Sequence, residues 1–439
     1  MTMQVGVLGA GISGIGAALL AKSRGHEVWV SDGMEISGER KKLLEENKIP
    51  FEEKGHSIDK LVACDLIVKS PGISNKSEIL KALVDAGKEI IGEIEWAYRN
   101  AEGKIIGITG SNGKTTTTGL CHHFLQEAGM DAAKVGNVGE GFCHFLAEHK
   151  ADWYVCELSS FQLEDLEAFR PRVAILLNIT PDHLDRYEYN LDKYADAKMR
   201  IVQAMTEEDT LIYNAMDPVT VAKVVSTQME SRLWSIRETE LMDDDKVYVQ
   251  DDLILDLSKS RLMGRHNQVN VIAAARAALL AGVPAESLQQ SLESFVNESH
   301  RMEWVGVVED VRYINDSKAT NVDAVYYALG AMKTPVIWIA GGLDKGNDYG
   351  PIMDLVKDKV KALICLGLDN SKLYEAFSTT VYNISETTTM REAVRRAASH
   401  ASSGDTVLLS PACASFDLFK DYRDRGDQFK EEVKDLVNV

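Results

Sequence analysis

The chain twice places an apolar strand directly before a glycine-rich turn and a helix, and this arrangement restricts the folds that it can adopt. The first turn, Gly9–Gly14, follows the apolar stretch 5–8, and the second, within 107–115, follows the stretch 104–109. In open α/β sheets, ligands bind beyond the carboxyl ends of parallel strands. We therefore expect parallel sheets that carry two separate nucleotide-type loops.

Strand-like and helix-like stretches alternate along the whole chain, which is typical of α/β proteins. At about 150 residues per domain, the 439 residues suggest two to four domains. We predict three α/β domains, over residues 1–98, 99–297 and 298–439. Short strand-like stretches within 208–262 favour a small antiparallel layer in the second domain. The expected strands are 5–8, 28–30, 66–68, 104–109, 153–157, 173–178, 210–213, 246–249, 253–257, 312–314, 336–340, 362–366 and 406–409, and a long helix is expected over 267–281.

The composition is that of a soluble globular enzyme, with 45% apolar and 26% charged residues. The net charge of −19 and the pI near 5.0 argue against a nucleic-acid-binding surface. The six cysteines form no CxxC pair or zinc spacing, so we expect reduced thiols in the cytoplasm. The sequence contains no run of 18 apolar residues, so we expect no membrane span.

The first glycine turn matches the pattern G-x-G-x-x-G at Gly9, Gly11 and Gly14, and Asp32 ends the next strand. Glycines let the backbone approach a diphosphate, and the following helix directs N–H groups at it. Taken alone the pattern suggests NAD, and a tight turn without a ligand is the alternative. The segment Ser70-Pro71-Gly72 ends another strand, as a plain turn or as part of the same ligand-binding edge.

The second turn, Gly107–Thr115, ends in the Gly-Lys-Thr of a phosphate-binding loop, although Ile108 replaces the first glycine of the strict Walker pattern. Backbone N–H groups would surround the phosphates, Lys114 would reach the β and γ phosphates, and Thr115 would bind Mg²⁺. A chance tripeptide is the alternative. An enzyme that acts on a nucleotide-linked substrate and consumes ATP would use both turns.

The chain resembles the Mur ligase family, the ATP-dependent amide-forming enzymes of peptidoglycan precursor synthesis. The resemblance extends over nearly the whole chain. The segments that carry it are Thr109–Thr115, Glu157–Leu163, Asn178–Asp185, Gly264–Asn267 with Asn270, and His300-Arg301. It implies a Rossmann-like N-terminal domain for a UDP-linked substrate, a central P-loop ATPase-type domain, and a C-terminal Rossmann-like domain for an amino acid.

Two C-terminal segments, Asn315–Asn321 and Leu409–Asp417, are similar to the members that add D-glutamate. The resemblance then implies joining UDP-N-acetylmuramoyl-L-alanine to D-glutamate through an acyl phosphate, with release of ADP and phosphate. It also implies ATP, two Mg²⁺ sites, a cytoplasmic monomer, and no nucleic-acid or membrane partner.

The resemblance implies a role for each candidate site residue. The catalytic residues are Lys114, Asn137, His183 and Lys198. ATP would contact Gly110, Ser111, Asn112, Gly113, Lys114, Thr115, Thr116, Asn267, Asn270, Arg301 and Asp316. The UDP-linked substrate would contact Gly11, Ile12, Ser13, Asp32, Ser70, Gly72, Asn137, Ser159 and His183. D-Glutamate would contact Lys318, Thr320, Lys345, Ser415 and Phe416, and Mg²⁺ would bind Thr115, Glu157, His183 and the carbamate of Lys198.

Three of these residues also have structural explanations. Lys198 alone suggests a solvated surface lysine, Asn137 a turn residue with positive φ, and Asp316 a helix N-cap. The chain also departs from the family pattern: Ile12 and Ser13 follow the second glycine, Gly33 and Met34 follow Asp32, and Asp344 precedes Lys345. An acidic side chain beside Lys345 would weaken the local field for an anionic substrate.

Three rival functions remain at this point. A nicotinamide-dependent dehydrogenase leaves the phosphate loop unused. A folylpolyglutamate synthase shares the chemistry but lacks the N-terminal dinucleotide-type domain. A non-catalytic nucleotide-binding regulator would have no need of Lys114, Glu157 and Lys198 together.

Overall fold

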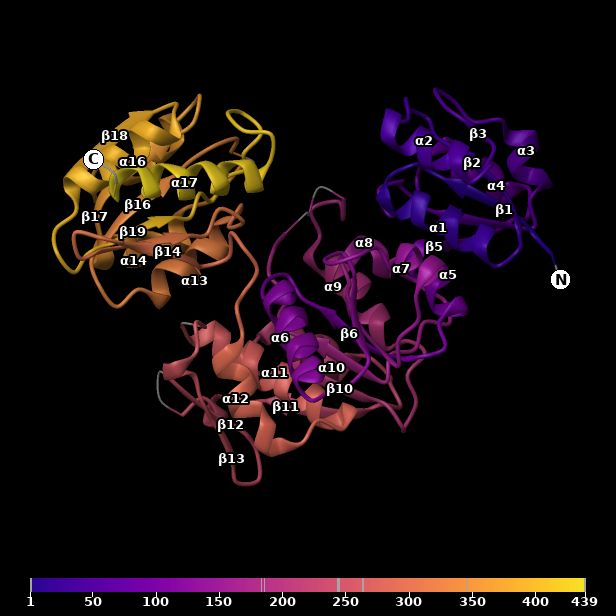
Figure 1. Cartoon of the computed structure of the whole chain (residues 1–439), viewed down its shortest axis with the longest axis horizontal. Coiled ribbons are helices and arrows are strands. Elements are labelled where there is room, and N and C mark those ends of the chain that lie inside the picture. The colour runs from indigo at the N-terminus through magenta and orange to yellow at the C-terminus, as the bar shows by residue number, and fades with distance from the viewer. Residues whose placement is uncertain are drawn as a thin grey trace. The chain divides into compact units, whose positions relative to one another are not determined.

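The computed structural model describes residues 2–182, 184, 186–242, 245–262, 264–344 and 346–437. Three large sheets lie within this part of the chain (Figure 1). Contacts divide the chain into two compact units. Unit 1 contains Met1–Glu240, Tyr248–Leu255 and Val269–Leu292, and unit 2 contains Leu241–Val247, Asp256–Gln268 and Glu293–Val439.

The first sheet of unit 1 has five parallel strands in the order β3-β2-β1-β4-β5. Its apolar strands are buried on both faces, as expected for a parallel sheet covered by helices. Val5 and Val7 of β1 pack against α1, whereas Leu8 packs with residues of α3 and α4 on the other face. The elements are β1 Gln4–Leu8, α1 Ile12–Ser23, β2 Glu27–Ser31, α2 Gly38–Glu46, β3 Phe51–Glu52, α3 Ile58–Ala63, β4 Leu66–Lys69, α4 Glu78–Asp85 and β5 Glu89–Gly92.

The second sheet of unit 1 has six parallel strands in the order β11-β10-β9-β6-β8-β7. Its strands are β6 Lys104–Thr109, β7 Ala132–Gly136, β8 Trp153–Glu157, β9 Val173–Leu176, β10 Thr210–Asn214 and β11 Arg232–Ile236. The helices along this stretch are α5 Glu93–Asn100, α6 Lys114–Glu127, α7 Phe142–Glu148, α8 Ser160–Leu163, α9 Leu191–Met199 and α10 Pro218–Ser226. Further along the chain come α11 Arg265–Ala281 and α12 Leu288–Ser294.

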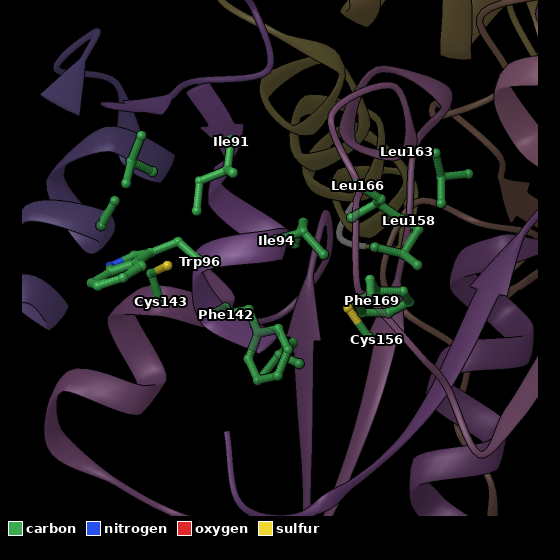
Figure 2. Close-up of a cluster of buried hydrophobic side chains, with 14 of the residues drawn as sticks. Ile91, Ile94, Trp96, Phe142, Cys143, Cys156, Leu158, Leu163, Leu166 and Phe169 are labelled. Carbon is green, nitrogen blue, oxygen red and sulfur yellow. The ribbon is translucent and has the colours of Figure 1, made fainter. Parts of the chain in front are cut away.

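One continuous apolar cluster connects the two sheets of unit 1. Figure 2 shows Ile94 and Trp96 of α5 with Phe142 of α7 and Leu158 after β8. Valines of β1 belong to the same cluster. The helix α5 therefore anchors the first sheet to the second through a shared hydrophobic core.

The small layer expected within 208–262 is a two-stranded sheet, β12 Lys246–Gln250 and β13 Leu253–Asp256. The expected strand 210–213 is not part of it, because β10 pairs in parallel with β9 and β11 of the six-stranded sheet. Only two residues join these strands, which requires an antiparallel hairpin. The Ala-rich helix α11 follows, and its buried Arg276 donates to Glu240 at 2.7 Å. Short 3₁₀ segments are η1 Arg200–Val202, η2 Glu238–Glu240, η3 Leu257–Lys259, η4 Ala285–Ser287 and η5 Gly350–Ile352.

The sheet of unit 2 has the order β14-β15-β19-β16-β17-β18, with β14 antiparallel to β15 and the other pairs parallel. Helices α13 and α14 lie on one side of this sheet, and α16 and α17 lie on the other (Figure 1). Successive residues of β16 face opposite sides: Trp338 packs with α13 and α14, and Ile339 packs with α16 and α17. The strands are β14 Glu303–Val308, β15 Val311–Asn315, β16 Val336–Ala340, β17 Val360–Leu366, β18 Asn383–Thr387 and β19 Thr406–Leu409. The helices are α13 Val322–Ala331, α14 Met353–Lys359, α15 Ser371–Phe377, α16 Met390–His400 and α17 Tyr422–Val437.

Candidate active site

The phosphate loop joins β6 to α6 and holds its shape through glycine. Gly113, the N-cap of α6, has φ +85°, and a Cβ there would lie 2.5 Å from Asn270 Oδ1. The ammonium of Lys114 donates to the carbonyls of Gly110 at 2.7 Å and Ser111 at 2.8 Å. The loop therefore ends at the N-terminus of α6, an arrangement suited to phosphate.

The Asn178 segment after β9 is hydrogen-bonded to this loop. Asn178 Oδ1 accepts from the N–H of Asn112 at 2.8 Å, and Ser111 Oγ donates to the carbonyl of Thr180 at 2.9 Å. The structure thus brings together two motifs about 65 residues apart in the chain. His183, in the second motif, lies outside the described residues.

Glu157, at the end of β8, is buried, and its two carboxylate oxygens differ in hydrogen bonding. Asn137 Nδ2 donates to its Oε1 at 2.8 Å, while its Oε2 has no hydrogen-bond partner among the described residues. Asn137 does not have a positive φ, whereas the preceding Gly136 does (φ +103°). The explanation of Asn137 as a turn residue with positive φ is therefore wrong. Nearby, Ser159 caps α8 in a capping box with Gln162.

Lys198 of α9 is buried, with 1% of its surface exposed, so the alternative of a solvated lysine is wrong. Its Nζ donates to the carbonyl of Gly110 at 2.9 Å and lies 4.5 Å from the ring centroid of Tyr194. Burial lowers the pKa of Lys198 well below its usual range, and the charge of Lys114 lowers it further, against opposing effects of Asp182 and Glu157. The lowered pKa favours the neutral, nucleophilic form of this amine.

The donor set fits Mg²⁺. Glu157 Oε2 is a buried oxygen without a partner, and Thr115 is buried at the start of α6. Hard cations prefer such oxygen ligands. No group of three or more His, Cys, Asp or Glu side chains suited to a metal occurs among the described residues, so an all-protein site would need other oxygen donors.

The glycine turn of the first sheet is tied to two neighbouring strand ends. Asp32 accepts from the N–H of Ala10 at 2.6 Å and from that of Met34 at 2.8 Å. Ser70 Oγ donates to the carbonyl of Gly9 at 3.3 Å. Asp32 therefore holds the loops together through both oxygens. The predicted substrate contacts at this edge are Gly11, Ile12, Ser13, Asp32, Ser70 and Gly72, and the Ile12 side chain is exposed.

Asp316 follows β15 in unit 2 and is buried. Its carboxylate accepts from the N–H of Met302 at 3.1 Å and from Ser410 Oγ at 3.0 Å. Burial raises the pKa of Asp316 to about 7, against these two hydrogen bonds and the charge of Arg301. The helix N-cap explanation is wrong, because Asn321 caps α13 by accepting from the N–H of Ala324.

The predicted D-glutamate contacts that the structure describes lie on the loops after β15 and β19. Lys318 Nζ is 5.4 Å from the ring centroid of Tyr422, Ser415 is buried, and Phe416 is 68% exposed. Thr320 lies on the same loop as Lys318. Lys345 is outside the described residues.

Asp344 is held within its own loop. Its carboxylate accepts from Tyr349 Oη at 3.0 Å and from two backbone N–H groups, and it pairs with Lys372 at 3.0 Å. Burial alone would raise the pKa of Asp344. The hydrogen bonds from Lys372, from the two N–H groups and from Tyr349 outweigh this effect, so the pKa of Asp344 is lowered. Lys372 thus offsets the acidic charge that would otherwise weaken an anion site.

Two side chains close to these loops were not predicted. Tyr194 Oη lies 3.1 Å from Ser111 Oγ, and the ring contacts Lys198. Its spacing of four residues from Lys198 on one helix was the available signal. Arg425 of α17, described below, carries no such local signal.

Comparisons with known proteins cover the whole chain. A model of the MurD N-terminal domain matches residues 4–79, the Mur ligase middle domain matches 108–278, and the Mur ligase glutamate ligase domain matches 300–413. Relatives named UDP-N-acetylmuramoylalanine--D-glutamate ligase include those of Cytophaga hutchinsonii (45% identical, covering 100% of both chains), Porphyromonas gingivalis W83 (46%, 98% of both) and Christiangramia forsetii (42%, 99% of this chain and 100% of the relative).

The chain belongs to the Mur ligase family. The predicted three-domain α/β fold is confirmed, and the dehydrogenase and regulator alternatives are set aside in favour of a ligase. Among solved structures, UDP-N-acetylmuramate-alanine ligase of Thermotoga maritima has the same fold, with a TM-score of 0.61 at 18% identity over 99% of both chains. Folylpolyglutamate synthase of Mycobacterium tuberculosis matches with a TM-score of 0.58 at 12% identity, over 76% of this chain and 91% of its own. None of the helices in the described part of the chain has the length and apolarity needed to cross a membrane.

Proposed function

We propose that this member of the family joins UDP-N-acetylmuramoyl-L-alanine to D-glutamate in the cytoplasm, as a monomer, with conversion of ATP to ADP and phosphate. The names of full-length relatives at 39–46% identity support this substrate pair. The structural observation that carries the proposal is the meeting of Lys114, Lys198 and Glu157 around one phosphate loop. We also propose the domain boundaries at 98 and 297.

The reaction begins at the carboxylate of the nucleotide substrate. One carboxylate oxygen attacks the γ-phosphorus, the bond to the β–γ bridging oxygen breaks, and ADP leaves. The amine of D-glutamate then attacks the acyl carbon, and the tetrahedral intermediate expels phosphate. Negative oxygens gather at each stage, so the site needs fixed cations and N–H donors.

The residues of unit 1 supply these groups. Lys114 leaves the carbonyls of Gly110 and Ser111 to contact the β and γ phosphates, and the loop N–H groups bind the phosphate oxygens. Thr115, Glu157, His183 and a carbamate on Lys198 would hold Mg²⁺, which neutralises phosphate charge when bound. Asn137, fixed by Glu157, orients the substrate near the new bond.

The environment of Lys198 favours the carbamate. A neutral amine adds to CO₂ and forms N-carboxylate with release of one proton, so a depressed pKa is the required starting point. The product is an anion near Glu157, and its two oxygens would be ligands for a hard metal.

Phosphate release tests the function directly. The enzyme is given ATP, Mg²⁺ and UDP-N-acetylmuramoyl-L-alanine, with D-glutamate, L-glutamate, meso-diaminopimelate or L-lysine added in turn. We expect release with D-glutamate alone. Release with another amine keeps the family and overturns the proposed roles of Thr320, Lys345 and Ser415.

A further inference from the structure

The guanidinium of Arg425 lies beneath three loops that follow different strands of the unit 2 sheet. Arg425 stands in the first turn of α17 and is 1% exposed. Its Nε donates to Ser317 Oγ at 3.0 Å and its Nη2 to the carbonyl of Ser317 at 2.8 Å. Both terminal nitrogens donate to the carbonyl of Cys413 at 3.2 Å, and Nη1 donates to that of Gly341 at 3.3 Å. One side chain therefore joins the loops after β15, β16 and β19.

The positive charge of this side chain has no ion-pair partner. No carboxylate oxygen of the described residues lies within 4.0 Å of it, whereas Arg276, equally buried, pairs with Glu240 at 2.7 Å. Burial lowers the pKa of Arg425 to about 10, which leaves it charged at neutral pH. The groups that accept its hydrogen bonds are a hydroxyl and three carbonyls, and the charge of Asp417 favours it without forming an ion pair. Such a buried charge is costly, and an arriving anion would reduce that cost.

The loop after β16 lies directly on the guanidinium. Gly342 has φ +126°, and a Cβ there would lie 3.2 Å from Nη1 of Arg425 and 2.2 Å from the carbonyl oxygen of Ala414. The absence of a side chain at Gly342 keeps the charge close to the loop surface. The loops so joined carry Lys318, Thr320 and Ser415, the proposed contacts of D-glutamate.

We propose that Arg425 is a positioning residue of the D-glutamate site, which fixes these three loops relative to one another and places beneath the dicarboxylate a positive charge that has no ion-pair partner among the described residues. This inference rests on the proposed function. It assigns Arg425 an effect on the amino acid and none on formation of the acyl phosphate, which needs no amine.

The test compares Arg425→Gln and Arg425→Lys with wild type in the full-length enzyme. We expect Arg425→Gln to raise KM for D-glutamate at least about tenfold and to leave KM for ATP within about twofold. Arg425→Lys keeps the charge but loses the planar set of donors, so its KM for D-glutamate should lie between those of wild type and Arg425→Gln. ADP formed in a single turnover without D-glutamate should match wild type.

Exposed Arg391 on α16 provides the matched control, Arg391→Gln, with wild-type constants expected. An unchanged KM for D-glutamate in either folded variant overturns the proposal. So does a fall in ADP formation and in melting temperature together with a rise in both KM values, which indicates a purely structural role. If Arg425→Gln fails to fold, Arg425→Lys decides by the same measurements. A wild-type enzyme inactive with D-glutamate contradicts the proposed function instead.

Discussion

Lys198 is buried between the carbonyl of Gly110 and the ring of Tyr194, where an ammonium ion is poorly solvated. If its carbamate is a metal ligand, Lys198→Ala removes that ligand and leaves space for a small anion. We expect kcat/KM to fall by about 100-fold or more and to recover in part with formate or acetate. Steady-state phosphate release with and without these salts measures both effects.

Lys193→Ala is the control, because Lys193 lies on the same helix but is exposed and pairs with Glu188. Its activity should equal that of wild type and should not respond to the salts. Full activity of Lys198→Ala without any salt would remove Lys198 from the site.

The carboxyl of Asp316 makes the stability of unit 2 depend on pH. Its pKa is about 7 in the folded chain against 3.8 as the ordinary value, so between these values the folded state binds more protons than the unfolded state. The free energy of unfolding therefore falls as pH rises through this window. From pH 5 to pH 8 the loss due to Asp316 should be roughly 2–3 kcal/mol.

Denaturant unfolding at both pH values measures this loss. Asp316→Asn should remove that part of the pH dependence, and Asp354→Asn, at an exposed position on α14, should not. An identical pH dependence in wild type and Asp316→Asn would contradict the assignment.

At the scale of elements, the glycines at the two ends of α6 allow the effect of backbone strain to be distinguished from the effect of a close contact. Gly113 before the helix and Gly129 after it have φ of +85° and +74°, which alanine adopts only at a cost of about 1 kcal/mol. A Cβ at Gly129 meets nothing within 4 Å, whereas one at Gly113 lies 2.5 Å from Asn270 Oδ1. Both alanine variants should therefore lose some stability, and only Gly113→Ala should weaken ATP binding, by about tenfold or more.

Titration with ATP and thermal melting of the two variants distinguish the effects. Equal ATP affinities would show that the phosphate loop tolerates the displacement of Asn270. A loss in both variants would indicate that the strain alone, transmitted along α6, disturbs the loop.

Elements could be predicted from the sequence where local pattern determines them. The apolar runs of β1, β6, β8 and β19 are buried on both faces and were expected as strands. The two-residue strand β3 and the half-exposed β14 give too short or too mixed a pattern to be expected. The position of β19 between β15 and β16 depends on pairing of strands far apart in the chain.

The candidate site likewise contains residues that a local sequence pattern indicates and residues that only long-range contacts place. Lys114 follows one predicted strand and Glu157 ends another, so their meeting at one sheet edge could be expected, whereas Asn137 follows β7, a strand that was not predicted. The hydrogen bonds of Arg425 reach residues 12, 84 and 108 positions away, and no local pattern indicates them.

At the scale of the whole molecule, Glu95 anchors α5, the helix that packs with both sheets of unit 1. Its carboxylate is fully buried and accepts from the N–H groups of Glu167, Ala168 and Phe169 at 3.0–3.1 Å and from Arg99 at 3.0 Å. Glu95→Ala removes this acceptor and leaves the N–H of buried Phe169 without a partner, at a cost of about 1–3 kcal/mol. Glu95→Gln keeps one carbonyl oxygen and should lose less.

The shared core of unit 1 determines how that loss is distributed. Because α5 packs into one cluster with residues of both sheets (Figure 2), we expect the two sheets to open together. Hydrogen exchange of the β1 and β6 amides should then accelerate by the same factor in Glu95→Ala. Glu102→Ala, which removes an exposed pair with Lys150, should change neither. Acceleration confined to β1 would mean that the first sheet opens independently, and that the apolar cluster around α5 does not couple the two sheets.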